Sequence, residues 1–186
     1  PLRLVGSEMC IRDRPNRSTE FSIMQIPQAT AEHHWLQRMT GHWTVSSECR
    51  MRPDDPPFQF SGTEVVRSLG ELWILAEGTG STPDIGCDSV MTLGYNPQQQ
   101  AFTGTFVGSK MTHLWLYRGQ FSADGQQLIL EAEGPDFSGT GTLTTFRDII
   151  QWIDENHRRM TSLVQNPDGQ WQHFMTTDYL RQPAAS

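Results

Sequence analysis

The chain has 186 residues, a formal net charge of -7, and 36% hydrophobic residues. This length fits one domain with a full hydrophobic core. The acidic balance argues against a protein that binds nucleic acid or an anionic membrane surface, since both partners require clustered Lys and Arg. No apolar run approaches the roughly 20 residues of a membrane-spanning helix, so we expect no membrane partner.

The first 23 residues differ in character from the rest of the chain. They lack the apolar core and the small-residue cleavage site of a secretory signal. The stretch from Leu4 to Arg14 resembles the translated sequencing-adapter read-through found in reading frames of metagenome assemblies. A disordered native arm is the alternative. We therefore expect residues 1–23 to be a non-native or disordered prefix, with Met24 as the native start.

The cysteines give an expectation about the compartment. Beyond the prefix only Cys49 and Cys87 remain. Neither belongs to a CxxC motif, and no histidine stands at metal-ligand spacing from them. Two isolated thiols without a signal peptide predict a reducing, cytoplasmic location.

Residues 29–40 are the one segment with a helical pattern. Thr30 is a suitable N-cap, with His33 in place of the usual Glu of a capping box. Trp35, Leu36 and Met39 share one face of the predicted helix. Such a short helix is marginal alone and must pack on something else.

From Trp43 onward the hydrophobic period changes to two, which predicts strands. Turn sequences such as Asn166-Pro167-Asp168-Gly169 recur about every 10 to 14 residues, with no helical segment between them. This spacing excludes βαβ units. The predicted strands cover residues 43–51, 58–69, 72–79, 86–95, 100–108, 111–121, 127–133, 140–153, 157–165 and 170–180.

About ten sequential antiparallel strands in one open sheet would leave two exposed edges, and closure removes them. A sandwich would need longer crossover connections than this sequence offers. We therefore predict an all-β fold, an antiparallel up-and-down barrel of about ten strands with one short N-terminal helix at one end. The predicted barrel domain covers residues 24–182, followed by a tail at 183–186.

The two ends of the predicted barrel carry a recognisable pair of motifs. Gly41-His42-Trp43 opens the first strand, and Tyr179-Leu180-Arg181 closes the last. This arrangement resembles the calycin superfamily, which includes the lipocalins. The resemblance implies that the Arg181 guanidinium covers the Trp43 indole and closes the barrel structurally. A buried Trp and an unrelated surface Arg are the alternative.

A longer set of motifs resembles a bacterial domain-of-unknown-function family, number 1579 in that series. The match extends over about residues 30–181. The family implies a calycin-like barrel and supplies no activity or substrate. The matching motifs include His34-Trp35-Leu36, Leu69-Gly70-Glu71-Leu72-Trp73, Met91-Thr92-Leu93-Gly94-Tyr95-Asn96-Pro97, Phe106-Val107-Gly108-Ser109-Lys110-Met111, His113-Leu114-Trp115 and Phe146-Arg147-Asp148.

No motif indicates a reaction. The sequence has no Gly-x-Ser-x-Gly nucleophile elbow, and its Gly-Thr-Gly segments lie between strands without a following helix that could hold a phosphate. No HxH or HExxH spacing brings two metal ligands together. We therefore expect no metal and leave open whether the protein is an enzyme, with a binding protein favoured.

The lumen of the barrel is the expected ligand site. His113 shares a strand face with Trp115 and Tyr117 in an aromatic row that suits a cavity wall. Arg147 and Asp148 are neighbours, so only one can point inward, and an inward Arg147 would clamp a ligand carboxylate. A buried hydrogen-bonded His113 and a cross-strand salt bridge of Arg147 are the alternatives. The residues we predict to bind the ligand are Trp73, Met91, His113, Trp115, Tyr117 and Arg147.

The sequence thus predicts a protein that binds a small, largely apolar molecule in a barrel lumen. One alternative is an enzyme that uses His113 or a buried carboxylate as acid or base. Another is a haem-binding barrel of the nitrobindin type, with His157 or His173 as axial ligand. That type carries a Gly-x-Trp-x-Gly-x-Gly signature, whereas Thr44-Val45-Ser46-Ser47 follows Trp43 here. We therefore expect no cofactor, with haem as the alternative.

Several predicted strands are apolar on both faces. Leu114 and Leu116 alternate with Trp115 and Tyr117, for example. Because a barrel has one interior, the excess outward apolar surface indicates a helix cover or a subunit interface. We expect a homodimer.

Overall fold

The computed structural model describes residues 27–51, 55–81 and 86–183. The predicted prefix 1–23, Met24 and residues 184–186 of the predicted tail lie outside the described residues. One helix and ten strands make up the described chain, and this helix, with seven residues, is too short to cross a membrane. In chain order the elements are α1 (Ala31–Gln37), β1 (Gly41–Cys49), β2 (Phe58–Leu69), β3 (Trp73–Ser81), β4 (Gly86–Asn96), β5 (Ala101–Gly108), β6 (Trp115–Phe121), β7 (Gln127–Pro135), β8 (Leu143–Asp154), β9 (His157–Gln165) and β10 (Trp171–Arg181).

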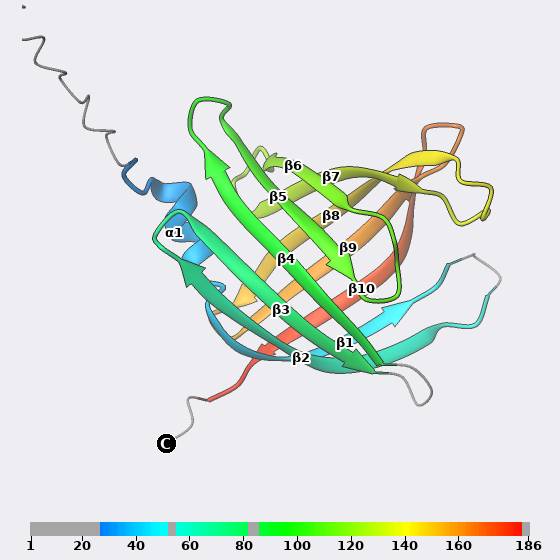
Figure 1. Cartoon of the computed structure of the whole chain (residues 1–186), viewed down its shortest axis with the longest axis horizontal. Helices are drawn as coiled ribbons and strands as arrows, with labels where there is room; N and C mark the ends of the chain where they lie inside the picture. The colour runs from blue at the N-terminus through cyan, green and yellow to red at the C-terminus, as the bar shows by residue number, and fades with distance from the viewer. Residues whose placement is uncertain (1–26, 52–54, 82–85, 184–186) are drawn as a thin grey trace, which may run out of the picture.

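The ten strands form one closed antiparallel barrel (Figure 1). Each strand pairs with the next along the chain, and β1 pairs with β10 to complete the circle. Closure gives every strand two partners, so the sheet has no free edge. The predicted all-β, up-and-down barrel with one short N-terminal helix is confirmed.

All ten predicted strands are present, and β6 shows the largest difference in bounds. Its predicted range began at residue 111, whereas the strand begins at Trp115. The reason is a turn after β5, in which the backbone N–H of Met111 donates a hydrogen bond to the carbonyl of Gly108 at 3.1 Å. Residues 111–114 have no regular structure.

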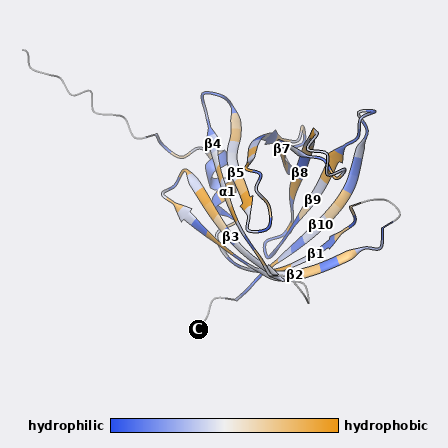
Figure 2. Cartoon of the chain, turned by 45° about the vertical axis from the view of Figure 1, so that its right-hand side comes forward, coloured by the Kyte–Doolittle hydropathy of each residue, from blue (hydrophilic) through white to orange (hydrophobic). Residues whose placement is uncertain are grey.

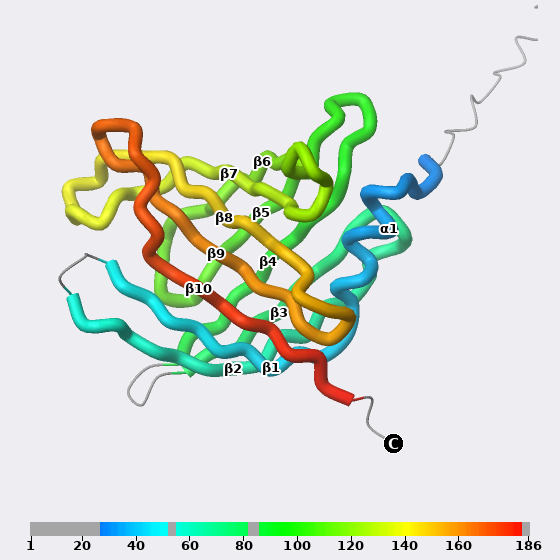
Figure 3. The backbone as a smooth tube through the Cα atoms, turned by 180° about the vertical axis from the view of Figure 1, so that it is seen from behind, coloured from blue at the N-terminus to red at the C-terminus, as the bar shows by residue number. Residues whose placement is uncertain are grey.

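Helix α1 covers one end of the barrel, which we call the closed end (Figure 3). The helix begins after Thr30, whose backbone N–H donates to Nδ1 of His33 at 2.9 Å. The imidazole therefore replaces the Glu of a capping box. Trp35 packs edge-on against Phe121 with ring centroids 5.3 Å apart. Leu36 is fully buried. The helix thus inserts an apolar face into the barrel, as its short length requires.

The core lies at the closed end. Along the strands, buried and exposed residues alternate, as expected for one face inside and one face in solvent, and Figure 2 shows hydrophobic and hydrophilic residues along the same strands. The large hydrophobic residues that are essentially inaccessible belong to one cluster. They are Leu36, Met39, Trp43, Ile74, Leu93, Phe102, Leu128, Leu130 and Ile150.

Candidate functional site

Arg181 links the last strand to Trp43 and to the segment after α1 at the closed end of the barrel. Its guanidinium carbon lies 4.2 Å from the centre of the Trp43 ring. Its Nη1 and Nη2 each donate a hydrogen bond of 2.7 Å, to the carbonyls of Thr40 and Arg38. The side chain therefore satisfies carbonyls of the segment after α1 while it stacks on the indole.

A buried ion pair lies next to the contact between Arg181 and Trp43. Arg158 is 5% exposed and pairs with Glu64, which lies on β2. The Arg158 guanidinium is stacked between two rings, 3.9 Å from the centre of Tyr179 and 4.7 Å from that of Trp43. Each charge neutralises the other, which the low dielectric of the interior requires. This pair belongs to the closed half of the interior.

Asp148 is the second inward carboxylate, and it stands in the middle of β8. The hydroxyl of Tyr117 donates to one of its oxygens, and the hydroxyl of Ser162 donates to the other at 2.5 Å. Burial raises the pKa of Asp148, although the two hydrogen bonds oppose this effect. The pKa of Tyr117 is also raised, by burial and by the neighbouring Asp148 charge. As a whole residue, Asp148 nevertheless remains partly exposed.

Aromatic rings line the interior at the end opposite α1, which we call the open end because no described helix covers it. Trp115 packs edge-on against Phe146 with ring centroids 4.8 Å apart. Phe174 packs against both Phe146 and Phe137, at 5.9 and 5.1 Å. These four rings form a wall contributed by β6, β8, β10 and the β7–β8 loop.

The opposite wall of the open half contains three glycines, with the side chains of Phe60 and Ser89 beside them. Gly78 and Gly80 occupy inward positions on β3, and Gly62 is their neighbour on β2. A Cβ placed on Gly80 would meet no atom closer than 3.7 Å. Strand β3 lies directly across the barrel from β8, since five steps separate them in either direction. The glycines on β3 therefore face the wall that carries Phe146 and Asp148.

On β4 and β5, the inward side chains nearer the open end are more accessible than those in the core, whereas the inward residues of β7 stay buried along the whole strand. On β4, Leu93 is inaccessible, while Met91, the next inward residue, is partly exposed. On β5, Phe102 is 1% exposed, while Phe106 is again partly exposed. Solvent thus reaches inward side chains of β4 and β5 beyond the packed core. We refer to this open half, bounded by the aromatic wall and the glycine wall, as the lumen.

The structure divides the predicted site residues between the two faces of the sheet. Met91, Trp115 and Tyr117 point inward, and Met91 and Trp115 pack against the core cluster that includes Tyr117. Trp73 lies on the outer face, where it is 38% exposed and its ring lies over Gly94. The parity of β3 fixes this position, because its buried residues, Ile74 and Ala76, are the even-numbered ones.

Arg147 also lies on the outer face. Its Nε donates to Glu131 at 2.9 Å, and its guanidinium stacks on Trp171 at 4.0 Å. Of the neighbouring pair Arg147 and Asp148, the carboxylate is therefore the inward member. The arginine makes the cross-strand salt bridge that the sequence left as the alternative.

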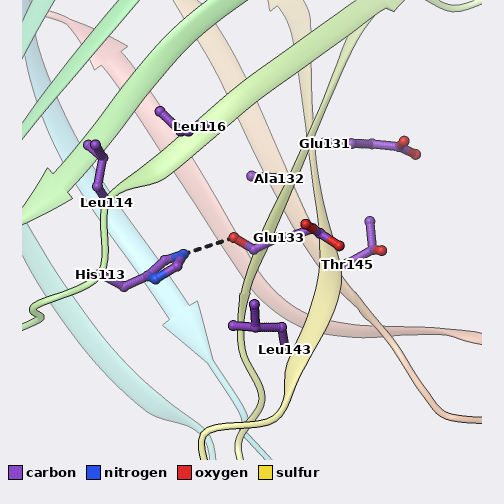
Figure 4. Close-up of a pocket in the computed structure, with 8 residues that line it drawn as sticks. All are labelled: His113, Leu114, Leu116, Glu131, Ala132, Glu133, Leu143 and Thr145. Atoms are coloured by element: carbon purple, nitrogen blue, oxygen red, sulfur yellow. Dashed lines mark hydrogen bonds between the residues drawn. The ribbon is translucent and has the colours of Figure 1, made fainter.

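His113 precedes β6 and borders a groove on the outer surface (Figure 4). Its Nε2 lies 2.9 Å from the carbonyl of Glu133. The groove has a volume of about 410 Å³ and opens where β6 and β7 diverge, since their pairing stops at Arg118 and Glu131. Its lining comprises His113, Leu114, Leu116, Glu131, Ala132, Glu133, Leu143 and Thr145.

This groove is a weaker candidate site than the lumen. Leu116 and Leu143 are 63% and 57% exposed, so a molecule in the groove would stay largely in water. The exposed leucines match the excess apolar surface noted in the sequence, and the homodimer remains a prediction.

The two histidines considered for haem lie away from the lumen. Nε2 of His157 is 2.6 Å from Asp178 on the outer face. His173 is exposed, and its Nε2 is 2.8 Å from the Thr176 hydroxyl. Neither histidine therefore serves as an inward axial ligand for haem. Within the same residues, no group of three His, Cys, Asp or Glu side chains could hold a metal ion.

Sequence reasoning named Asp148 as the neighbour of Arg147 but did not include it in the predicted site. It missed the partnership of Asp148 with Ser162, because these residues are brought together by the β8–β9 register. It also missed the glycine wall. Gly78 and Gly80 share a parity with Ile74 and Ala76, and this regular spacing is a signal that could have placed them inside.

The closed ten-strand barrel with a helix at one end defines a calycin-like protein. The family model described as "Protein of unknown function (DUF1579)" matches residues 28–181, so the chain belongs to this family. No curated protein matches the sequence.

Two solved structures share the fold at low sequence identity. The S-type phycobiliprotein lyase CPES from Guillardia theta is 11% identical, with a TM-score of 0.59 over 86% of this chain and 100% of its own. Rv2717c from M. tuberculosis is 13% identical, with a TM-score of 0.59 over 84% of this chain and 100% of its own. At these identities the likeness concerns the fold.

Proposed function

We propose that the protein binds a small, largely apolar molecule in its lumen, which the molecule enters from the open end. The observation that carries this proposal is the rise in solvent access along the inward face of β4 and β5. A barrel that served only as a packed core would bury Met91 and Phe106 as completely as Leu93 and Phe102. Here Met91 and Phe106 keep contact with water.

The chemistry of the two walls supports a flat ligand. Ligand sites are mostly apolar and contain a few placed polar groups. The ring wall around Trp115 and Phe146 supplies aromatic faces and edges. The glycine wall lets a ligand approach the backbone of β3 closely. Asp148, Tyr117 and Ser162 are the polar groups between them.

Native mass spectrometry of freshly purified protein tests the proposal. We expect a bound species of small mass that is lost on denaturation. The same sample should bind the neutral fluorophore N-phenyl-1-naphthylamine, with an increase in emission. If neither the co-purified species nor the fluorophore binds, the proposed function is wrong.

A matched pair of variants on β3 locates the binding. Gly80→Leu adds an inward side chain where a Cβ has room, so the barrel should fold while the lumen is filled. Thr79→Leu adds a similar side chain on the exposed outer face. We expect the fluorophore affinity to fall at least tenfold in Gly80→Leu and to stay unchanged in Thr79→Leu. Equal affinities in both variants would place the probe outside the lumen.

A second candidate function is favoured by Asp148. An inward acid with a raised pKa and hydroxyls in reach is the arrangement expected of an acid/base catalyst. If the protein is an enzyme, the co-purified molecule should be converted on incubation with fresh wild-type protein. The conversion should stop in Asp148→Asn. Unchanged molecules in both incubations would leave binding as the function.

A further inference from the structure

The lumen contains one carboxylate without a charged partner. Two hydroxyls contact Asp148, and no salt bridge among the described residues includes it. The other inward charges, Glu64 and Arg158, pair with each other. With Asp148 ionised, these three side chains therefore carry a net charge of minus one.

From this arrangement we infer that the ligand of the lumen carries a nitrogen donor, a protonated amine or an equivalent N–H group, which binds the Asp148 carboxylate. This inference rests on the proposed function and assigns the chemical class of its ligand.

The geometry leaves Asp148 able to accept such a donor. An ionised carboxylate offers about four acceptor positions, and Tyr117 and Ser162 occupy one on each oxygen. The two hydroxyls also hold the carboxylate in one orientation, so its free positions are fixed before the ligand arrives. A charged N–H donor on a carboxylate makes one of the stronger hydrogen bonds available in a protein. Asp148 keeps partial exposure as a residue, and this binding requires that a molecule from the open end reaches its carboxylate.

The same charges disfavour an anionic ligand. The only inward cation among the described residues is Arg158, which is already paired with Glu64. Its Nε lacks a hydrogen-bond partner, but that atom is inaccessible, since the guanidinium lies between the rings of Trp43 and Tyr179. A carboxylate ligand would therefore meet Asp148 without reaching a compensating charge.

The inference predicts a pH dependence with a defined sign. The groups that face Asp148 are Tyr117 and Tyr179, which burial keeps protonated, and the internally neutral pair Glu64 and Arg158. Of these groups, Asp148 is the carboxylate whose pKa burial raises. A primary aliphatic amine stays protonated over this range. Its affinity should rise as pH increases through the raised pKa of Asp148 and fall as pH decreases.

Calorimetric titration with three probes of one shape tests the inference. The probes are 1-naphthylmethylamine, 1-naphthalenemethanol and 1-naphthoate, which present a cation, a neutral hydroxyl and an anion on the same ring system. We expect the amine to bind at least tenfold more tightly than the naphthoate at pH 7. In Asp148→Asn the amine should lose at least tenfold in affinity and its pH dependence, while the alcohol should change less than threefold.

Glu131→Gln is the matched control, because Glu131 is a carboxylate on the outer face of the neighbouring strand β7. The amine should bind this variant as it binds the wild type. Ser162→Ala provides a second measurement that keeps the Asp148 carboxylate. Because the Ser162 hydrogen bond lowers the pKa of Asp148, its removal should move the midpoint of the amine's pH dependence upward. This shift tests the inference even if Asp148→Asn does not fold.

The outcomes separate the two proposals. If none of the three probes binds and no small molecule co-purifies, the proposed function fails. If the probes bind but the naphthoate equals or exceeds the amine, the lumen binds ligands and the assignment of a nitrogen donor is wrong. An amine affinity that does not change with pH in the wild type overturns the assignment in the same way.

Discussion

At the closed end of the barrel, aromatic rings are packed beneath α1 and covered by arginine side chains, whereas at the open end Trp115 keeps partial contact with water. Trp43 is stacked by both Arg158 and Arg181 and is inaccessible. Trp115, by contrast, packs on Phe146 and His113 and remains partly exposed. The two ends use the same type of residue and differ in what covers it.

This difference shows how one barrel can combine a stable half with a receptive half. The closed end buries apolar area and satisfies its charges internally, which stabilises the fold. The open end leaves apolar area and one carboxylate accessible, which costs stability and provides a surface for a ligand. Changes at the closed end should therefore alter the free energy of unfolding, and changes at the open end should alter binding.

The largest effect should follow from Arg158→Met. This change leaves Glu64 as an unpaired charge that is 12% exposed, and we expect it to lower the free energy of unfolding by about 3–5 kcal/mol. Urea denaturation followed by tryptophan fluorescence measures the change. The double variant E64Q/R158M should recover most of the loss. A double variant as unstable as the single one would show that packing of the arginine, not its charge, is what matters.

The next prediction compares one ring at each end. Trp35→Ala removes the α1 ring that contacts Phe121 and Trp152, and we expect a loss of about 3 kcal/mol. Phe137→Ala removes a ring of the open end and should cost about 1 kcal/mol. Thermal unfolding of both variants checks the order. Equal losses would mean that the two ends contribute alike to stability.

Asp148→Asn should have a smaller effect on stability, with a sign that depends on pH. Burial raises the pKa of Asp148 in the folded state, so the native protein holds this proton more tightly than the unfolded chain. Its favourable contribution is complete below the unfolded pKa and is lost as pH rises through the folded pKa. Relative to wild type, Asp148→Asn should therefore be more stable at pH 7 than at pH 4. Denaturation at both pH values measures the difference, and the opposite trend would contradict the assigned direction of the pKa.

The smallest effect should come from Arg147→Ala on the outer face. The Arg147–Glu131 pair is partly exposed, so its loss should cost no more than about 1 kcal/mol. Because Arg147 points away from the lumen, the affinity for N-phenyl-1-naphthylamine should stay the same. A fall in that affinity would give Arg147 the role in binding that the sequence predicted.

Much of the fold could be predicted because its information is local. The alternation of apolar residues and the spacing of turns define the strands, and sequential antiparallel strands allow one simple closure. The start of β6 was predicted too early because Met111 continues the apolar alternation, while a turn hydrogen bond to Gly108 takes that residue out of the strand.

The site was harder to predict because it depends on contacts between distant strands. The register of β8 with β9 brings Asp148 to Ser162, and closure of the barrel brings Arg158 to Glu64, 94 positions earlier in the sequence. The alternation of buried residues along β3 also places Trp73 on the outer face, whereas its aromatic character alone would assign it to the interior. For Arg147 and Asp148 the sequence states that one side chain points inward and does not say which.

The β1–β10 pairing has a consequence for the folding of the protein during its synthesis on the ribosome. Thr44 on β1 pairs with Leu180 on β10. Strand β1 can therefore gain its second neighbouring strand only after nearly the whole chain has been synthesised. Until then the growing sheet has an unpaired edge that can join another chain. Completion of β10 is therefore the step at which a nascent, association-prone sheet becomes a finished barrel, and release of a chain that stops before β10 should yield aggregates in place of a shorter fold.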